Sequence, residues 1–378
     1  MSAAQLIARL DRELRDIWTT ADDDGSAPLT RVCTMNLEVV APSRDLLTRY
    51  TAVVDEVTAT IPARAILASI EPDAPNGLEG EVSAVCFPDA GKKICSERII
   101  LRAGGQSAAG AASAIESFLV PELPTALVWL GRVHVEDPVF QDLANDANRI
   151  VLDSEYTSIA SLIHVAKWAR TQPNAPRIAD LAWTRISSWQ ELLARFFDEP
   201  DTTPLAASIT KLRLEQASEP GSRLGPEAAL VLGWIATRLG WKTSRLGGVL
   251  RFKRPDGGAV VVELGSVARP QGVAPQTLAS LTVEASSGEA SLRGEVHREL
   301  ASGLPGQVES TPDADVVVWR CSKGGAPAIE QRVRLGANKA AKWLERTLHR
   351  PPLDPAFDES VAFAEQIVED GLTVGGSP

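Results

Sequence analysis

The chain has 378 residues, of which 44% are hydrophobic and 23% are charged, and its 38 basic and 49 acidic side chains give a formal net charge of −11. This length exceeds the ~250–300 residues at which a single hydrophobic core stops growing, so two domains are expected. The composition excludes a wholly disordered chain, a collagen and a coiled-coil rod. An acidic chain without a basic patch is not expected to bind nucleic acid or an anionic membrane surface.

The apolar stretches are short. Residues 126–130 and 316–319 are far below the ~20 residues that a membrane helix requires. The start of the chain shows no basic segment followed by an apolar run and a small-residue cleavage site. We therefore expect a cytoplasmic protein with no membrane partner.

Residues 1–27 are predicted to form an N-terminal helix and an acidic linker. Leu6, Leu10 and Leu14 recur at helical spacing, and charged residues fill the other face. The acidic run at 22–26 then interrupts the pattern. Its glycine does not stand at the sixth position of a calcium-binding loop, and no glutamate stands at the twelfth, so a solvated linker is expected.

Residues 28–172 are predicted to form an N-terminal α/β domain with a mostly parallel sheet. The unbroken apolar run at 126–130 is typical of a strand in a parallel sheet. Alternation of strands and helices favours the same class. Strands are expected at 31–40, 64–70, 79–87, 96–103, 124–130 and 149–153, and helices at 42–60, 107–119, 139–144 and 157–170.

Residues 177–370 are predicted to form a second α/β domain with a mixed sheet, after a linker at 171–176 and before a flexible tail at 371–378. Turn residues between alternating segments indicate β-hairpins. Pro226 stands at the first turn of a predicted helix that Gly240 ends. Strands are expected at 209–216, 248–253, 259–264, 278–285, 289–297 and 315–321, and helices at 226–239, 337–349 and 360–368.

The segment 178–197 is predicted to contain two helices with a break near Ser187. Ser188 and Glu191 have the spacing of a capping box, in which each side chain bonds a backbone amide of the first turn. After it, apolar residues follow the helical i, i+3, i+4 spacing without error.

Arg185 interrupts the apolar stripe of this segment, and two arrangements would satisfy it. In the first, Arg185 pairs internally, with Asp180 as one candidate, and the motif is structural. In the second, Arg185 and Trp183 face outward as anchors for a partner protein, because Trp and Arg are enriched at binding hot spots. Asp180, Trp183, Arg185 and Trp189 are therefore the candidate partner-interface residues.

No catalytic, metal-binding or cofactor-binding residue is expected. The glycine-rich segment 104–110 lies between a strand and a helix, where a phosphate loop would stand, but Ala111 and Ala112 replace the required Lys and Ser or Thr. The glycines of this segment are therefore expected to form tight turns, or a weak anion site made of backbone amides. The histidines are dispersed, and only His134, beside Glu136 and Asp137, merits inspection as a catalyst.

The chain contains four cysteines: Cys33, Cys86, Cys95 and Cys321. This number does not make a disulfide scaffold. Cys86 and Cys95 would face each other across a predicted hairpin, which makes them a candidate redox pair. Free thiols without functional effect are the main expectation for both, since unpaired cysteines are commonly buried as small hydrophobic residues.

Several motifs together resemble the OpcA family, the glucose-6-phosphate dehydrogenase assembly proteins. The most specific is the run at 180–185 followed by Trp189 and by residues 191–193. The segments 121–124, 94–99 and 62–66 and the strand that starts near Arg31 fit in order and spacing, so that the resemblance covers residues 28 to 365 or so.

This resemblance implies a non-enzymatic partner protein that assembles or allosterically activates glucose-6-phosphate dehydrogenase, the entry enzyme of the oxidative pentose phosphate pathway. Members of the family in photosynthetic bacteria also relay thioredoxin control through cysteines, to which the four cysteines of this chain are not matched. The alternative is an α/β enzyme that binds a sugar phosphate or nucleotide through motifs that differ from the known ones.

Overall fold

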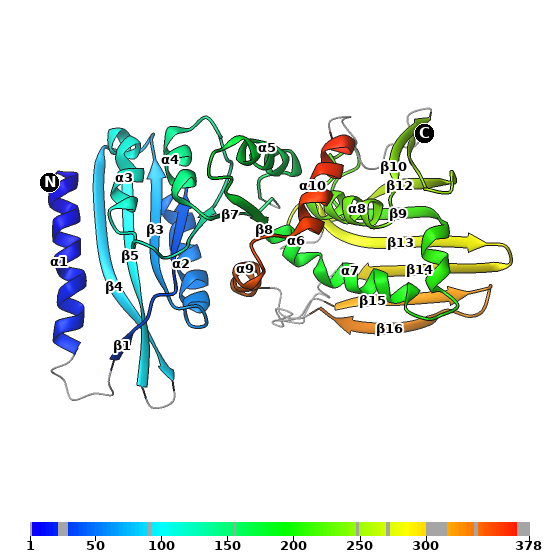
Figure 1. Cartoon of the computed structure of the whole chain (residues 1–378), viewed down its shortest axis with the longest axis horizontal. Coiled ribbons are helices and arrows are strands. Elements are labelled where there is room, and N and C mark those ends of the chain that lie inside the picture. The colour runs from blue at the N-terminus through cyan, green and yellow to red at the C-terminus, as the bar shows by residue number, and fades with distance from the viewer. Residues whose placement is uncertain are drawn as a thin grey trace. The chain divides into compact units, whose positions relative to one another are not determined.

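The computed structural model describes residues 2–21, 29–89, 92–154, 156–246, 249–269, 273–299, 316–335 and 339–368 (Figure 1). The acidic run at 22–26 and the tail at 371–378 lie outside these described residues. The chain forms two compact units. The first consists of Met1–Thr157, His164–Leu181 and Ala340–Pro352, and the second of Ser158–Ile163, Ala182–Lys339 and Leu353–Pro378.

The sheet of the first unit has the strand order β1-β5-β3-β2-β6-β7-β8, and β4 pairs with β5. Only β4 and β5 run antiparallel, so the predicted mostly parallel sheet is confirmed. The strands are β1 (Leu29–Arg31), β2 (Met35–Ala41), β3 (Ala63–Glu71), β4 (Gly77–Asp89), β5 (Lys92–Gly104), β6 (Thr125–Trp129), β7 (Arg149–Leu152) and β8 (Arg177–Asp180).

One face of this sheet forms an apolar core with two helices. Leu37, Leu67 and Val128 pack there with Val54 of α2 and Leu344 of α9. Ser43 caps α2, because its hydroxyl accepts a hydrogen bond from Leu46 N at 3.3 Å. The helices assigned wholly to this unit are α1 (Ala3–Ala21), α2 (Arg44–Thr58), η1 (Gly105–Gly110), α3 (Ala111–Glu116), α4 (Pro138–Asp146) and α9 (Ala340–His349), whereas α5 (Ile159–Thr171) begins in the second unit.

Helix α1 lies along β4, and Figure 1 shows it at the edge of the first unit. Its predicted apolar stripe is buried, with Leu6, Leu10 and Leu14 at most 4% exposed. The backbones approach closely at Gly80, where a Cβ atom would lie 2.6 Å from a methyl group of Leu10. Glycine at this position therefore permits the helix to pack on the strand.

Two predicted elements of the first unit are divided in the structure. The strand expected at 31–40 is two strands, β1 and β2, and the helix expected at 107–119 is the 3₁₀ helix η1 followed by α3. Gly105 has a φ of +58°, and a Cβ atom there would lie 2.8 Å from Asn76 Cα. A tight turn rather than a continuous helix is therefore formed at this position.

The sheet of the second unit has the order β10-β11-β12-β9-β13-β14-β15-β16. Strands β9 and β12 are parallel and the other neighbours are antiparallel, so the predicted mixed sheet with β-hairpins is confirmed. Its strands are β9 (Ile209–Ala217), β10 (Lys242–Leu246), β11 (Val249–Lys253), β12 (Ala259–Val267), β13 (Thr277–Ser287), β14 (Ala290–Arg298), β15 (Val316–Lys323) and β16 (Ile329–Arg334).

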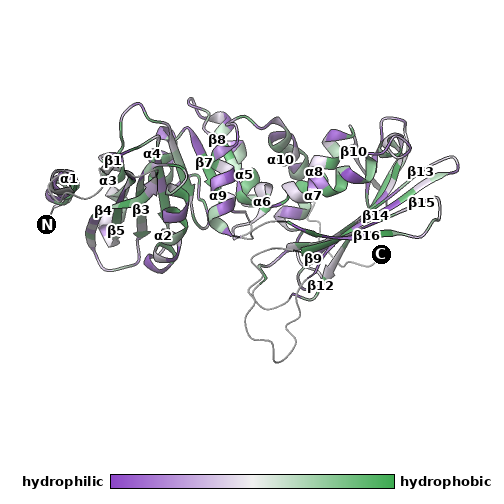
Figure 2. Cartoon of the chain, turned by 90° about the horizontal axis from the view of Figure 1, so that it is seen from below, coloured by the Kyte–Doolittle hydropathy of each residue, from purple (hydrophilic) through white to green (hydrophobic). Residues whose placement is uncertain are grey.

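Helices contact one face of this sheet, and Figure 2 shows that these helices carry both hydrophobic (green) and hydrophilic (purple) residues. Helices α8 and α10 approach each other closely, because a Cβ atom on Gly233 would lie 2.4 Å from Ser360 O. The apolar core beneath them contains Phe252, Val262 and Leu281. The helices are α6 (Leu181–Arg185), α7 (Ser187–Ala194), η2 (Arg195–Phe197), η3 (Thr203–Ser208), α8 (Pro226–Arg238) and α10 (Pro355–Val368).

The segment 178–197 differs in part from its prediction. The break near Ser187 is confirmed, since α6 ends at Arg185 and α7 begins at Ser187. The first residues belong to strand β8 instead of a helix, because they pair with β7. The prediction of a capping box at Ser188 is wrong. Ile186 is the N-cap of α7 and makes no side-chain hydrogen bond, and the Ser187 hydroxyl donates to Thr184 O at 2.7 Å.

Within the described part of the chain, every helix is too short or too polar to span a membrane.

Candidate functional site

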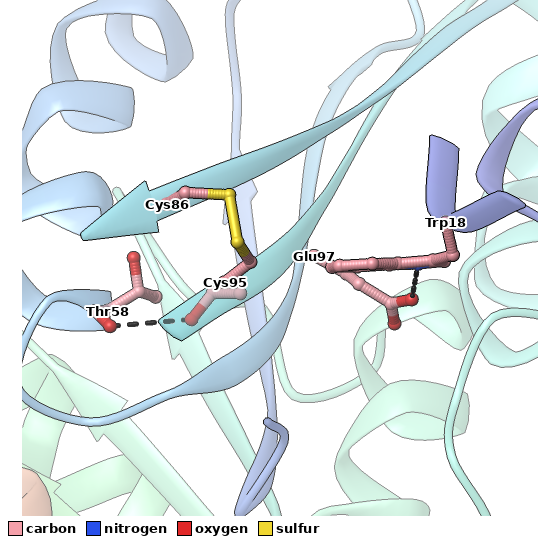
Figure 3. The surroundings of a disulfide bond; sticks show 6 residues. Trp18, Thr58, Cys86, Cys95 and Glu97 are labelled. Atoms are coloured by element: carbon pink, nitrogen blue, oxygen red, sulfur yellow. Dashed lines mark hydrogen bonds between the residues drawn. A yellow bond between two sulfur atoms is a disulfide. The ribbon is translucent and has the colours of Figure 1, made fainter. Parts of the chain in front are cut away.

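The first candidate site lies on the hairpin of β4 and β5. Cys86 and Cys95 stand directly opposite each other in its register, with their Cα atoms 4.0 Å apart, and a disulfide joins them (Figure 3). The expectation of two free thiols is therefore wrong. The sequence indicated the hairpin but not its register, and the register brings the two sulfur atoms together.

Glu97 follows on the same strand and is completely buried, with 0% exposure. Its carboxylate accepts a hydrogen bond from Trp18 Nε1 at 2.8 Å (Figure 3) and lies 2.8 Å from Arg31 Nε and 2.6 Å from Arg64 Nη2. Two guanidinium groups thus compensate the buried charge. Through this carboxylate, α1, β1 and β3 are tied to β5, and we call Trp18, Arg31, Arg64 and Glu97 the Glu97 cluster.

The free thiol of Cys33 borders this cluster, with its sulfur 4.0 Å from Glu97 Oε2. Burial, followed by the negative charge of Glu97, raises the pKa of the Cys33 thiol. Because the thiolate is the reactive form, this environment keeps Cys33 protonated and unreactive.

A second buried carboxylate of the first unit has the opposite surroundings. Glu38, on β2, is 0% exposed, and neither of its carboxylate oxygens has a hydrogen-bond partner among the described residues. Burial, followed by the charges of Asp146 and Glu116, raises the pKa of Glu38 to about 8. The side chain is therefore protonated and neutral near pH 7. Sequence reasoning missed it, since a single Glu in an apolar strand resembles a solvent-facing residue.

The four candidate interface residues lie inside their units. Asp180, in the first unit, is 1% exposed and accepts hydrogen bonds from Ser154 N at 3.0 Å and Ser154 Oγ at 2.8 Å. In the second unit, Trp183 is 5% exposed, and its indole Nε1 donates to Asp354 Oδ2 at 2.8 Å. Both side chains are thus held by internal hydrogen bonds.

Arg185 is buried as well and lies 3.2 Å from Glu227 Oε1. The other oxygen of Glu227 accepts a hydrogen bond from Leu278 N at 2.8 Å, so the pair joins α6, α8 and β13. Trp189 is 2% exposed, and the Arg298 guanidinium lies 5.6 Å from its ring centroid. These contacts support the structural one of the two arrangements that the sequence left open, whereas a direct contact with a partner stays a prediction.

The glycine-rich segment and the histidines show no converging catalytic groups in the described residues. Asn76 Oδ1 accepts hydrogen bonds from the backbone amide and the hydroxyl of Ser107 at 3.1 and 3.0 Å. His134 is exposed. Among the described residues, no group of three or more His, Cys, Asp or Glu side chains is arranged to hold a metal ion.

The second unit presents a charged sheet face that sequence reasoning also missed. Lys211 lies 2.7 Å from Glu263, Arg213 lies 2.7 Å from Glu215, and Arg320 lies 2.7 Å from Glu330. A hydrogen bond from Lys211 lowers the pKa of Glu263, so these carboxylates are ionised near pH 7. The alternation of charged residues along β9 was the available signal.

Two family profiles match the sequence in succession. Residues 54–177 match the profile described as the N-terminal domain of a glucose-6-phosphate dehydrogenase subunit, and residues 176–361 match that of the C-terminal domain. The chain belongs to the OpcA family. This membership confirms the resemblance that the sequence motifs indicated, and both OpcA domains are represented in the chain.

Curated relatives carry the OpcA name. The chain is 26% identical to the OxPP cycle protein OpcA of Synechocystis sp. over 330 residues, which are 84% of this chain and 66% of that relative. It is 33% identical to the protein of the same name from Synechococcus elongatus over 200 residues, which are 50% of this chain and 43% of that relative. The matched part thus spans less than two thirds of the length of either relative.

Solved structures give a much weaker likeness. An NAD binding oxidoreductase from Klebsiella pneumoniae has a TM-score of 0.44 at 10% identity, with 89% of this chain and 95% of that chain covered. UDP-N-acetylglucosamine 3-dehydrogenase GnnA from Acidithiobacillus ferrooxidans has a TM-score of 0.42 at 11% identity, with 89% and 96% covered. Likenesses with TM-scores below 0.5 do not indicate the chemistry of this OpcA chain.

Proposed function

We propose that this chain is a non-enzymatic binding partner that assembles or allosterically activates glucose-6-phosphate dehydrogenase. The observation that carries the proposal is the pair of family matches, which describe residues 54–361 in succession as the two domains of a subunit of that enzyme. The relatives named for the OxPP cycle are consistent with it.

The physical requirement for such a role is modest. A partner activates an enzyme when it binds the active state more tightly than the inactive one, and no catalytic group is needed. What the partner must provide is a rigid surface, since ordering a flexible surface on binding costs free energy. The buried pairs of Glu97 with Arg64 and of Glu227 with Arg185 each tie several elements together within one unit.

The test is to purify the chain together with the glucose-6-phosphate dehydrogenase of the same cell. Co-elution in size-exclusion chromatography is expected. The KM of the enzyme for glucose 6-phosphate, or the fraction of its assembled form, is expected to change when the chain is added. Two matched controls are the dehydrogenase alone and the dehydrogenase with heat-denatured chain.

Two outcomes would contradict the proposal. One is a chain that neither co-elutes with the dehydrogenase nor alters its kinetics or assembly. The other is robust turnover of a sugar phosphate or nucleotide by the chain alone, maintained through further purification, which would favour the alternative of an α/β enzyme.

The bond between Cys86 and Cys95 is the redox element of the proposal. The proposal keeps the cytoplasmic location expected from the sequence, where glutathione and thioredoxin reduce most disulfides. In that compartment the redox potential would decide whether the disulfide is formed or reduced. The pair would thereby couple the stability of the first unit to the redox state of the cell. Stability and dehydrogenase binding, compared under oxidising and reducing conditions, test this consequence.

A further inference from the structure

The two faces of the sheet in the second unit have opposite chemical character. One face is apolar and buried, with side chains such as Leu281 and Val296 at most 1% exposed. On the other face, the strand register aligns one row of side chains across six neighbouring strands. This charged row consists of Glu263, Arg213, Thr282, Glu295, Arg320 and Glu330.

The four charges nearest to Thr282, which lies on β13, are antisymmetric about it, and Glu330 at the end of the row has no counterpart on the other side. The nearest neighbours on the two sides are Arg213 and Glu295, and the next are Glu263 and Arg320. These four side chains remain 49%, 27%, 39% and 43% exposed, respectively, so each is accessible for a further ion pair. A row whose charge changes sign across its midpoint is complementary to a copy of itself turned about that midpoint.

We propose that this face is a homodimer interface, on which a second copy of the chain packs about a two-fold axis that runs parallel to β13, between the two sheets and above Thr282. In this arrangement Arg213 faces Glu295 of the second copy, and Glu263 faces Arg320 of the second copy. The symmetry repeats both contacts, so that four ion pairs form across the interface.

The direction of the axis follows from the same charges. A two-fold axis in the plane of the sheet but perpendicular to the strands would place every charge of the row opposite its own copy, which is repulsive. Both axes keep the strands of the two copies aligned, as in sheets packed face to face, so the charges alone select the axis along β13.

A neighbouring row contributes less. It contains Lys211, Glu284 and Arg293, and the proposed axis places Lys211 opposite Arg293 of the second copy. The axis along β13 also places Glu284 opposite Glu284 of the second copy, so every direct contact of this row joins like charges. Each cation has Glu284 of its own chain beside it and Glu284 of the second copy on the diagonal, which offsets part of this repulsion. The charged row therefore determines the orientation of the two copies.

The sheet is large enough for a stable contact. Eight strands spaced ~4.8 Å apart, with about eight residues each at ~3.3 Å per residue, present a face on the order of 1,000 Å². Standard protein interfaces bury about 800 Å² on each partner. The area and the charge pattern together fit a second copy of this chain.

The experiment compares the solution mass of the chain with that of two variants by size-exclusion chromatography with light scattering. Twice the monomer mass is expected for the original chain. Arg213→Glu is expected to raise the dimer dissociation constant about ten-fold or more, and the combination of Arg213→Glu with Glu295→Arg is expected to restore the dimer, because the contacts between copies then have the reversed signs. Arg238→Glu, on α8 and away from this face, is the matched control.

A second variant protects the test against a folding defect. Thr282→Arg places two like charges on the proposed axis without removing an ion pair within the chain, and it is expected to give a monomer with an unchanged melting temperature. A monomeric original chain at about 100 μM would overturn the proposal, since a standard interface binds more tightly. So would a dimer unaffected by both folded variants. A chain that is monomeric alone but loses the dehydrogenase through Arg213→Glu would assign the face to that partner instead, which also overturns the proposal.

Discussion

Glu38 and Glu97 lie on the same sheet of the first unit and are both 0% exposed, yet their surroundings differ. Glu97 is held by Arg31, Arg64 and Trp18, whereas both oxygens of Glu38 are without partners in the described part of the structure. Burial costs a carboxylate several kcal/mol unless cations and donors compensate it. The two residues thus show two solutions: one carboxylate is paired with guanidinium groups, and the other is neutralised by a raised pKa.

The largest expected effect comes from removing the compensation of Glu97. Arg64→Met leaves the buried carboxylate with Arg31 as the remaining guanidinium, and we expect a loss of about 3–5 kcal/mol in the free energy of unfolding. Urea unfolding at pH 7 measures it. The double variant Arg64→Met with Glu97→Gln is the control and should recover much of the loss, because it no longer buries an unpaired charge. Equal stability of Arg64→Met and the original chain would show that the pair is not what compensates Glu97.

The second prediction concerns Glu38 and pH. Its pKa of about 8 in the folded state exceeds the value of 4.5 in the unfolded chain, so between these values the folded state binds more protons. The free energy of unfolding should therefore fall as pH rises from 4.5 to 8, by a few kcal/mol at most, and then level off with respect to this group.

Glu38→Gln tests this directly, since Gln has nearly the same shape and no charge to lose. The difference in stability between Glu38→Gln and the original chain should grow in favour of the variant as pH rises toward 8. The acidic groups around Glu38, which include Asp146 and Glu116, are present in both proteins. A difference that stays constant from pH 5 to 8 would refute the raised pKa.

The third prediction extends the comparison to the second unit, where Glu227 is compensated by Arg185 and by Leu278 N. The variant Trp183→Ala with Arg185→Ala removes an indole hydrogen bond to Asp354 and leaves Glu227 without this guanidinium. We expect a loss of about 3 kcal/mol or more in stability, together with normal dehydrogenase binding by the folded fraction. An unchanged melting temperature with lost binding would instead make these residues direct partner contacts.

The smallest expected effect comes from the disulfide beside the Glu97 cluster. Replacing Cys86 and Cys95 by Ser opens a short loop, and we expect a loss of about 2 kcal/mol in stability. Reduction should lower the melting temperature of the original chain to about that of the double variant. The melting temperature of the variant itself should not respond to reductant. Binding to the dehydrogenase under both conditions then shows whether the redox state of the pair is transmitted to the partner.

Sequence periodicity predicted many elements of both units, although not all their boundaries. The stripe of Leu6, Leu10 and Leu14 predicted α1, and the apolar run at 126–130 predicted β6 within a parallel sheet. Two hairpins of the second unit, β11–β12 and β13–β14, were predicted from their turn residues. These features are local, because side-chain spacing and turn chemistry act over a few residues.

Only the tertiary structure decided which residues face one another. Residues 177–180 form strand β8 because they pair with β7. The polar sequences of β10 and β16 do not indicate strands, and both segments are strands at the edges of the second sheet. The register of β4 and β5 joined Cys86 to Cys95. The same holds for Glu38 and Glu97, which look alike in sequence. The partners of a side chain come from strands and helices distant along the chain, so pairing, pKa and burial follow from long-range register and packing.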